Sequence, residues 1–317
     1  MKSLYLTLIF AFLAVHATAE LVQSITPHFK QWLQDNGYGS FSFDRADIAG
    51  GSYGGKSDDK DKIEREPVIF FHGNSDHAVG NEGEQFNGFT DSISYFLSQG
   101  YKTSELYITT WGPANQQLAS QQTHSYEYVN YLRNFTEAVL KYTKAKKINV
   151  IAHSMGVTLA RKVIRGGSMQ DNGETYQLGE SFAPKVDTFL AIAGANLGLV
   201  VCKFSFVLPT CGKSNGFYPG TAAGPVGLST YLNDLLQNQE KEGDYVFTML
   251  STADDLILYG DKVYGKYTSQ IDYENDSKIY TNLGHMAMKS QTAAEQYQVI
   301  TKHAFSQRAT AFLSESF

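Results

Sequence analysis

Short apolar runs and helical apolar patterns alternate along the chain from Pro67 onward. Residues 68–71, 148–152 and 186–193 are short, mostly apolar runs, which are typical of parallel strands buried on both faces. The helix pattern is clearest at 126–142, with apolar side chains at Val129, Leu132, Phe135, Val139 and Tyr142. Further strands are predicted at 105–110, 245–250 and 278–282, and further helices at 89–97, 155–164, 228–236 and 291–304. The alternation predicts an α/β protein with a mostly parallel sheet of about six strands and helices on both faces.

Two segments stand outside this alternation. Residues 21–34 are predicted to form a helix, and the Gly-, Ser- and Asp-rich residues 37–62 a long loop with a solvated charge run at 56–62. Residues 196–227 are Gly- and Pro-rich and yet apolar, and a loop of this length in a compact domain is usually functional or disordered. We expect an N-terminal helix and loop extension at 20–66, a catalytic domain at 67–317, and within it an apolar insertion at 196–227 that is a candidate lid.

The first residues have the pattern of a secretory signal peptide at 1–19. Lys2 supplies the positive charge, residues 4–15 the short apolar run, and Ala17-Thr18-Ala19 a small-residue cleavage site that would leave a mature chain beginning at Glu20. The alternative is a membrane anchor, but the run is too short for a transmembrane helix, and no other run reaches about 18 apolar residues. The pattern predicts a secreted, extracellular protein without a transmembrane anchor.

The cysteines and two sequons agree with export. Cys202 and Cys211 are the two cysteines of the chain, and in an oxidising compartment we expect them to form one disulfide, the alternative being two free thiols. Asn134 and Asn275 begin Asn-x-Ser/Thr glycosylation sequons. Asn134 falls on the solvent-facing side of the predicted helix at 126–142, which favours its use.

Composition and charge exclude several classes of partner. Hydrophobic residues make up 42% of the chain, which is enough for a substantial core and too much for a disordered protein. The formal net charge is −6, which argues against nucleic acid, or an anionic membrane surface, as a charge-driven partner. The charge does not argue against an apolar lipid surface.

Ser154 is the candidate nucleophile because it stands between a predicted strand and a predicted helix. A sharp strand-to-helix turn lifts a serine hydroxyl above the sheet, and the small residues Ala152 and Gly156 allow strand and helix to approach closely. The backbone N–H of Met155 would then face the space where an oxyanion forms. The alternative is an ordinary turn in which Ser154 only caps the helix.

The second candidate donor follows the strand at 68–71. Gly73 permits a tight turn there, and the backbone N–H of Asn74 is predicted to complete an oxyanion hole. His72 could act as a base or a metal ligand, but we expect it to form hydrogen bonds within this loop. A metal site made from His72, Asp76 and His77 is an alternative whose spacing matches none of the usual zinc patterns.

A serine nucleophile needs a histidine base and a carboxylate that orients it. His285 and His303 follow Ser154 in the chain, and His285 is favoured because it comes just after a predicted strand. Either Asp254 or Asp255, after the strand at 245–250, could supply the carboxylate. The order Ser, acid, His is that of the α/β-hydrolase fold. It predicts attack of Ser154 on an ester carbonyl, with no cofactor and no metal.

Several stretches of the chain resemble the class 2 lipases, a family that includes small secreted bacterial lipases and secreted nematode lipase-related proteins. The matching stretches are residues 67–74, 106–112, 150–156 and 251–254, and Gly112-Pro113-Ala114-Asn115 and Gly194-Ala195-Asn196 look closest to the nematode members. The resemblance implies hydrolysis of triacylglycerol or simpler carboxylic esters, and it favours Asp254 over Asp255.

Three functions are compatible with the sequence. The first is a triacylglycerol lipase or carboxylesterase that acts at a lipid–water interface. The second is a phospholipase or acyltransferase on the same scaffold, and the third a non-catalytic lipid-binding relative. The sequence does not specify the oligomeric state.

Overall fold

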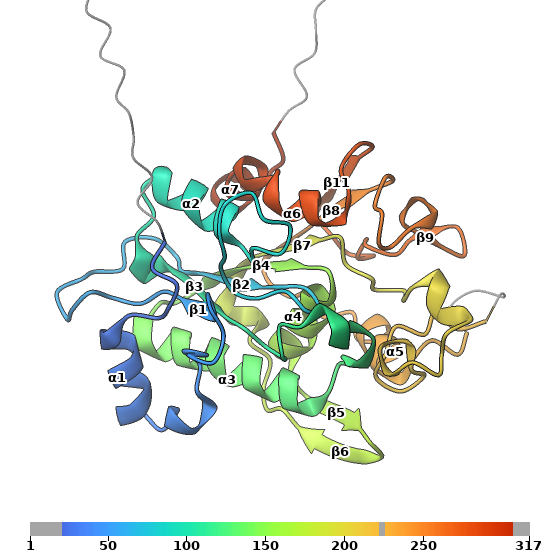
Figure 1. Ribbon diagram of the computed structural model, residues 1–317, viewed down its shortest axis with the longest axis horizontal. Coiled ribbons are helices and arrows are strands. Elements are labelled where there is room, and N and C mark those ends of the chain that lie inside the picture. Colours follow the sequence, from blue (N-terminus) through green and yellow to red (C-terminus); the bar gives the residue numbers. More distant parts are fainter. Residues whose placement is uncertain (1–20, 222–225, 307–317) are drawn as a thin grey trace, which may run out of the picture.

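The computed structural model describes residues 21–221 and 226–306. Its centre is a seven-stranded sheet of order β1-β3-β2-β4-β7-β8-β11 (Figure 1). Neighbouring strands are parallel from β3 to β11, and β1 is antiparallel to β3. In sequence order the strands are β1 (Ser52–Tyr53), β2 (Val68–Phe71), β3 (Leu106–Thr109), β4 (Ile148–His153), β7 (Val186–Ile192), β8 (Tyr245–Ser251) and β11 (Asp276–Tyr280). The mostly parallel sheet is confirmed, with seven strands instead of about six.

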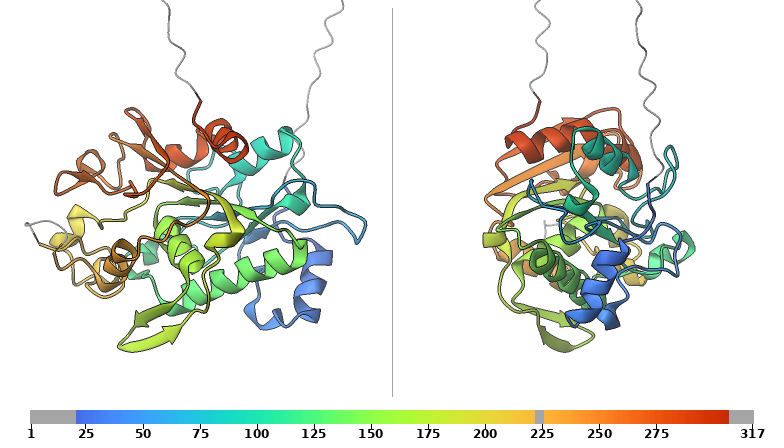
Figure 2. Two further views of the ribbon diagram at one scale, coloured as in Figure 1. Left: turned by 180° about the vertical axis from the view of Figure 1, so that it is seen from behind. Right: turned by 90° about the vertical axis from the view of Figure 1, so that its left-hand side faces the viewer.

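Helices cover both faces of the sheet, as predicted (Figures 1 and 2). One face carries α2 (Thr90–Ser98), α6 (His285–Ser290) and α7 (Ala293–Lys302), and the other α1 (Pro27–Asp35), α3 (Tyr126–Thr143), α4 (Met155–Arg165) and α5 (Thr230–Gln237). Side chains of a strand alternate between the two faces. Phe70 and Ile151 accordingly pack in one core, and Phe71 and Ala152 in the other. The central strands are therefore apolar on both sides, which explains their continuous apolar runs.

The N-terminal extension joins the same sheet. The helix predicted at 21–34 begins only at Pro27, because Thr26 is its N-cap and accepts a hydrogen bond from the Phe29 amide. The loop predicted at 37–62 contains β1, in which Ser52 pairs with Thr109 of β3. Two residues are too few to produce an alternating pattern, so this edge strand was not predicted.

The sequence pattern did not predict several smaller elements. The predicted helix at 291–304 is the shorter α7, and α6 precedes it. Two small antiparallel pairs lie outside the main sheet: β5 (Ser168–Asp171) with β6 (Glu174–Gln177), and β9 (Lys262–Val263) with β10 (Lys266–Tyr267). The short 3-10 helices are η1 (Gly39–Phe41), η2 (Thr103–Glu105), η3 (Gln116–Gln121), η4 (Ala183–Lys185), η5 (Val200–Lys203), η6 (Pro209–Cys211) and η7 (Tyr259–Asp261).

The features linked to export have mixed outcomes. The disulfide between Cys202 and Cys211 is present, as predicted. Asn134 is half-buried, and its Nδ2 donates to the Asn130 carbonyl at 2.8 Å, whereas Asn275 is exposed. The predicted signal peptide and Glu20 lie outside the described residues. Within the described ranges, no helix combines the length and apolarity needed to span a membrane.

Candidate active site

Ser154 occupies a constrained turn between β4 and α4. Its backbone has φ 56° and ψ −129°, a conformation that costs a non-glycine residue about 1–3 kcal/mol. Close packing surrounds the turn: a Cβ on Gly156 would lie 2.4 Å from the carbonyl oxygens of both Phe71 and His72. Only glycine fits there, because β2 passes directly against the start of α4. The turn therefore holds the Ser154 hydroxyl at the carboxyl edge of the sheet.

Three predicted side chains meet at this edge in one hydrogen-bonded row. The Ser154 Oγ lies 2.8 Å from Nε2 of His285, and Nδ1 of the same ring lies 2.7 Å from Oδ2 of Asp254. Asp254 follows β8, and His285 is the first residue of α6, after β11. Parallel strands present their carboxyl ends at one edge, so residues 131 positions apart in sequence come into contact there.

The structure distinguishes the two candidate acids. Oδ1 of Asp254 accepts the amides of Leu256 and Ile257 at 2.9 and 2.7 Å. Burial alone would raise the pKa of Asp254, but the hydrogen bond and charge of His285, together with these two amides, hold it below its ordinary value. Asp255 instead accepts the backbone N–H of His285 at 2.7 Å. Asp254 therefore faces the imidazole as a carboxylate, and Asp255 caps α6.

Gly73 and Asn74 pass beside the nucleophile. A Cβ on Gly73 would lie 2.9 Å from the Ser154 Cβ, so only a residue without a side chain allows this approach. The Asn74 side chain is held by the Ala119 carbonyl, to which its Nδ2 donates at 2.9 Å. The Met155 amide is the first of α4 and has no acceptor within the helix. Asn74 and Met155 line the same cavity as Ser154.

His72 is used by the loop itself. Its Nδ1 donates to the Gly73 carbonyl at 2.8 Å, and its Nε2 accepts the Trp111 amide at 3.0 Å. Burial lowers the pKa of His72 to about 4, so the ring is neutral. Asp76 pairs with Lys289 at 2.6 Å. In the parts of the chain that are described, no three His, Cys, Asp or Glu side chains gather around a space that would hold a metal ion.

Two further contacts at the site were missed by sequence reasoning. His153 is buried and neutral, because burial holds its pKa well below the ordinary value, and its Nε2 donates to the His285 carbonyl at 3.0 Å. The Asp76–Lys289 pair is also buried, with each side chain about 1% exposed. Lys289 lies one turn after His285 on α6, so this pair ties the Asn74 loop to the helix that carries the base. Neither contact has a local sequence signal.

The cavity above Ser154 has a volume of about 280 Å³. Its walls are mainly apolar and come from several segments. Leu199, Thr210 and Phe217 belong to the insertion, and Leu256 and Ile257 follow Asp254. The insertion is thus a wall of the candidate active site.

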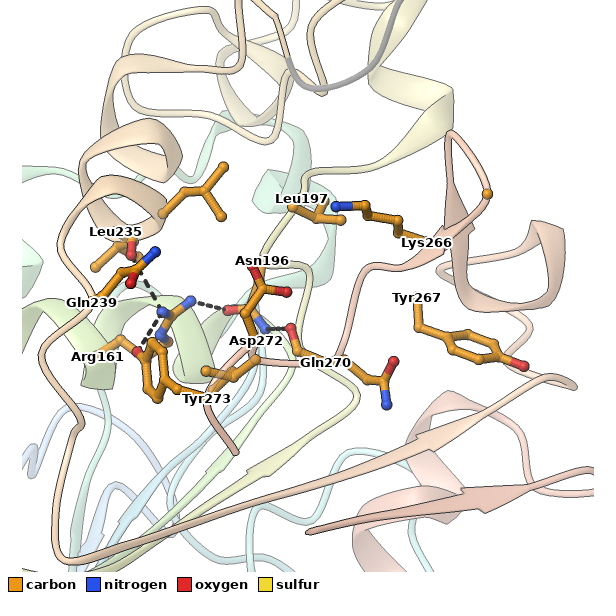
Figure 3. A pocket seen from close by; sticks show the side chains of 13 residues that line it. Arg161, Asn196, Leu197, Leu235, Gln239, Lys266, Tyr267, Gln270, Asp272 and Tyr273 are labelled. Carbon is orange, nitrogen blue, oxygen red and sulfur yellow. Dashed lines mark hydrogen bonds between the residues drawn. The ribbon is translucent and has the colours of Figure 1, made fainter. Parts of the chain in front are cut away.

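A second cavity of about 270 Å³ lies between α5 and residues 265–273 (Figure 3). The guanidinium of Arg161, at the edge of this cavity, donates to Oδ1 of Asn196 at 2.7 Å and to the hydroxyl of Tyr273 at 3.0 Å. It also forms a buried ion pair with Glu242. These contacts join α4 to the chain around the cavity. Ser154 and His285 do not line it, so the chemistry belongs to the first cavity.

The chain is similar to several solved structures. Among solved structures, Aspergillus fumigatus lipase B has a TM-score of 0.54 and 12% sequence identity; the match covers 81% of this chain and 57% of lipase B. The Paleococcus ferrophilus monoacylglycerol lipase has a TM-score of 0.48 at 12% identity, and the match covers 80% of this chain and 98% of that one. The Bacillus licheniformis lipase BlEst2 has a TM-score of 0.49 at 10% identity, and the match covers 76% of this chain and 96% of that one.

The likeness to lipase B shows the fold, and the predicted α/β-hydrolase architecture is confirmed. This chain spans just over half the length of that protein. The family model described as Lipase (class 2) matches residues 65–298. Because this match covers most of the chain, the predicted resemblance is confirmed, and the chain belongs to the class 2 lipases, a family of carboxylic ester hydrolases.

Proposed function

We propose that the protein is a secreted triacylglycerol lipase that works through an acyl-enzyme on Ser154. The observation that carries the proposal is the row of hydrogen bonds from Ser154 through His285 to Asp254. Ser154 and His285 line a mainly apolar cavity. A nucleophile, a base and a carboxylate that orients the base are the groups that acyl transfer needs. The proposed export rests on the signal pattern at 1–19 and the disulfide.

In the proposed mechanism, Nε2 of His285 takes the Ser154 proton as Oγ attacks the ester carbonyl carbon. Asp254 holds the imidazole and stabilises the imidazolium that forms. The Asn74 and Met155 amides donate to the oxyanion. The imidazolium then protonates the leaving alcohol, and an acyl-enzyme remains. Water, activated by His285, releases the fatty acid and restores Ser154.

The walls of the cavity support the proposed substrate class. Leu199, Phe217, Leu256 and Ile257 offer apolar contact to an acyl chain, whereas a charged or strongly polar acid would lose hydration there. Carboxylesterase, phospholipase and acyltransferase activities use the same chemistry and are the competing outcomes of the experiment. For glycosylation, exposed Asn275 is the better candidate, since the Asn134 amide is engaged within α3.

The test is covalent labelling together with a substrate series. Ser154→Ala should abolish labelling by a fluorophosphonate and lower kcat on p-nitrophenyl esters by about 10⁴-fold or more. Ser98→Ala, an exposed serine at the end of α2, is the matched control and should behave as wild type. Undiminished labelling of Ser154→Ala would exclude this residue as the nucleophile.

Titration of released acid from triacylglycerol emulsions then separates the competing activities. A lipase hydrolyses both tributyrin and long-chain emulsions. Hydrolysis confined to short soluble esters would identify a carboxylesterase. No hydrolysis by pure wild-type protein would favour a non-catalytic lipid-binding relative.

A further inference from the structure

Exposed apolar side chains gather at the mouth of the active-site cavity. Eight of the ten large apolar residues that are exposed in the described ranges lie in two parts of the chain: a first mouth segment at 204–208, together with Val226, and a second mouth segment at 256–259. They are Phe204, Phe206, Val207, Leu208, Val226, Leu256, Leu258 and Tyr259, and we call them the mouth surface. The segments around them also supply Thr210, Phe217 and Ile257 to the cavity wall. Exposed apolar side chains concentrated in this way mark an interaction surface.

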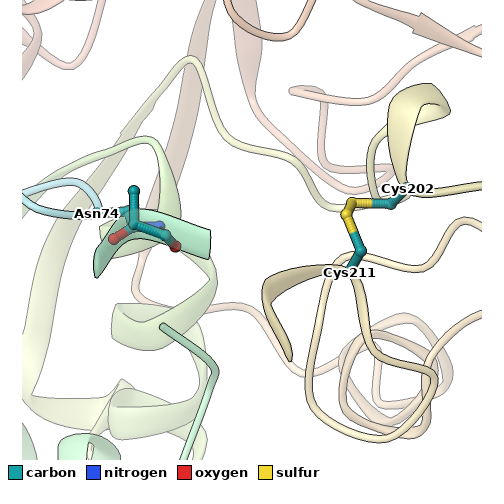
Figure 4. The surroundings of a disulfide bond; sticks show 4 residues. Asn74, Cys202 and Cys211 are labelled. Atoms are coloured by element: carbon teal, nitrogen blue, oxygen red, sulfur yellow. A yellow bond between two sulfur atoms is a disulfide. The ribbon is translucent and has the colours of Figure 1, made fainter. Parts of the chain in front are cut away.

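The insertion that carries this surface is fastened to the rest of the fold. The Cys202–Cys211 disulfide joins η5 to η6 in the first half of the insertion (Figure 4). The His124 amide donates to the Asn215 carbonyl at 2.9 Å, Nδ2 of Asn215 donates to the Asp171 carboxylate at 2.6 Å, and the Asn196 amide donates to the Thr268 carbonyl at 2.8 Å. These bonds favour a fixed wall over a lid that folds across Ser154. The side chains between the two cysteines are therefore displayed in the open, with Val207 82% exposed.

The chain that follows the second mouth segment contacts the insertion. The Tyr264 hydroxyl donates to the Gly220 carbonyl at 2.9 Å, and the Lys203 ammonium lies 5.7 Å from the Tyr264 ring centre. Leu256 is exposed at 52% and also lines the cavity. The two segments thus flank one opening that leads to Ser154.

The charge of this region differs in sign from that of the whole chain. Residues 196–227 contain Lys203 and Lys213 and no Asp or Glu, whereas the formal net charge of the chain is −6. The Lys213 ammonium lies 4.8 Å from the Phe206 ring centre, so charge and apolar surface stand side by side. Lys262 and Lys266 add two exposed cations beyond the second segment. Long lysine side chains beside aromatic rings are suited to an interface that is apolar below and charged above.

We propose that the mouth surface docks onto a phospholipid surface of net negative charge. Phe204, Phe206 and Val207 enter the headgroup region, while Lys203 and Lys213 pair with the phosphates. In this orientation the cavity opening faces the lipid. The use of such docking rests on the proposed ester hydrolysis. It also revises the expectation from net charge, because the insertion itself carries two lysines and no carboxylate side chain.

Vesicle flotation with full-length protein tests the proposal. Ser154→Ala serves as the background, so that vesicles of phosphatidylcholine, with or without 30 mol% phosphatidylglycerol, stay intact. We expect at least tenfold tighter binding to the anionic vesicles at low salt, converging with the neutral ones at high salt. Lys203→Gln with Lys213→Gln should weaken anionic binding about 25-fold, near fivefold for each lysine. Val207→Asp should weaken it at least tenfold.

Matched controls separate the surface from general effects. Lys144→Gln with Lys146→Gln removes two exposed lysines at the end of α3, and Val22→Asp alters an apolar residue that is 68% exposed elsewhere. Both should bind as the background does. Equal binding to neutral and anionic vesicles would overturn the proposal, and so would mouth variants that match these controls. A catalytically inert wild type that still binds would refute only the proposed hydrolysis, since binding is read without turnover.

Discussion

Replacing Lys289 by methionine should reverse the pH dependence that Asp76 contributes to stability. Asp76 would stay buried but would lose its ammonium partner. Burial alone would raise the pKa of Asp76, but Lys289, with His72 and the His77 amide, lowers it to about 2 from 3.8. A shift of nearly two units corresponds to about 2.5 kcal/mol. Since the folded pKa is the lower one, this stability is complete above about pH 4 and is lost as the pH falls through 2.

In Lys289→Met the unopposed burial should raise the folded pKa of Asp76 above its unfolded value. The variant should then lose about 3–5 kcal/mol at pH 7, the usual cost of a buried charge left unpaired. Because Asp76 can take up a proton, the loss should shrink between pH 7 and pH 5, a range in which the wild-type contribution of this carboxyl is constant. Urea unfolding at the two pH values measures both effects.

The same variant should lower kcat on a soluble ester, because the Asp76–Lys289 pair fixes the Asn74 loop relative to α6. Complete loss of one oxyanion donor, about 10²–10³-fold, is the upper bound. Asp76→Asn combined with Lys289→Met should regain most of the stability, since no buried charge remains. Lys278→Met, whose partner Glu295 lies nearer the surface, should cost under about 1 kcal/mol. An unchanged urea midpoint for Lys289→Met at pH 7 would refute the reasoning.

Three further predictions concern other contacts. Gly156→Ala should lower the free energy of unfolding in urea by about 3 kcal/mol or more, because its Cβ would lie 2.4 Å from two carbonyl oxygens. Gly39→Ala is the control and should change the free energy little, because its Cβ would lie 3.7 Å from the nearest atom. Similar urea midpoints for the two variants would contradict this prediction. Burial raises the pKa of Asp261 to about 7, so the stability contributed by its protonated carboxyl is present below pH 3.8 and is lost as the pH rises to 7. Asp261→Asn should therefore narrow the difference in unfolding free energy between pH 4 and pH 8 by about 2–4 kcal/mol. A stability–pH profile equal to that of wild type would count against this prediction. Replacing Cys202 and Cys211 by alanine opens a loop of sequence separation 9 and should cost about 2.5 kcal/mol; a melting temperature equal to wild type would show that the bridge adds nothing.

The sequence predicted the sheet and the three side chains of the proposed catalytic row, because both depend on local patterns and chain order. Buried strands must be apolar, and a serine nucleophile needs a tight turn before a helix, with its acid and base later in the chain. Ser154 and His285 follow from these requirements, which leave Asp254 and Asp255 as candidate acids, and the resemblance to the class 2 lipases favours Asp254. The structure brings Ser154, His285 and Asp254 within hydrogen-bonding distance.

The missed features depend on contacts between distant segments. The Asp76–Lys289 pair joins residues 213 positions apart, and nothing near either residue indicates the other. The two-residue strand β1 exists through its pairing with β3. The apolar side chains of the insertion illustrate a different limit, since composition shows that Val207 is apolar and only the fold shows that it is exposed.

The order of the sheet also has a consequence for how activity arises during folding. The strand before Ser154, β4, is central, whereas Asp254 follows β8 and His285 follows the edge strand β11. Parallel pairing over such separations is slow, because loop closure precedes the contacts that reward it. A chain in which β11 has not yet docked therefore lacks the base that stands beside Ser154 in the complete fold. Recovery of esterase activity in a refolding experiment should thus report docking of this last strand, and lag behind the recovery of helical signal.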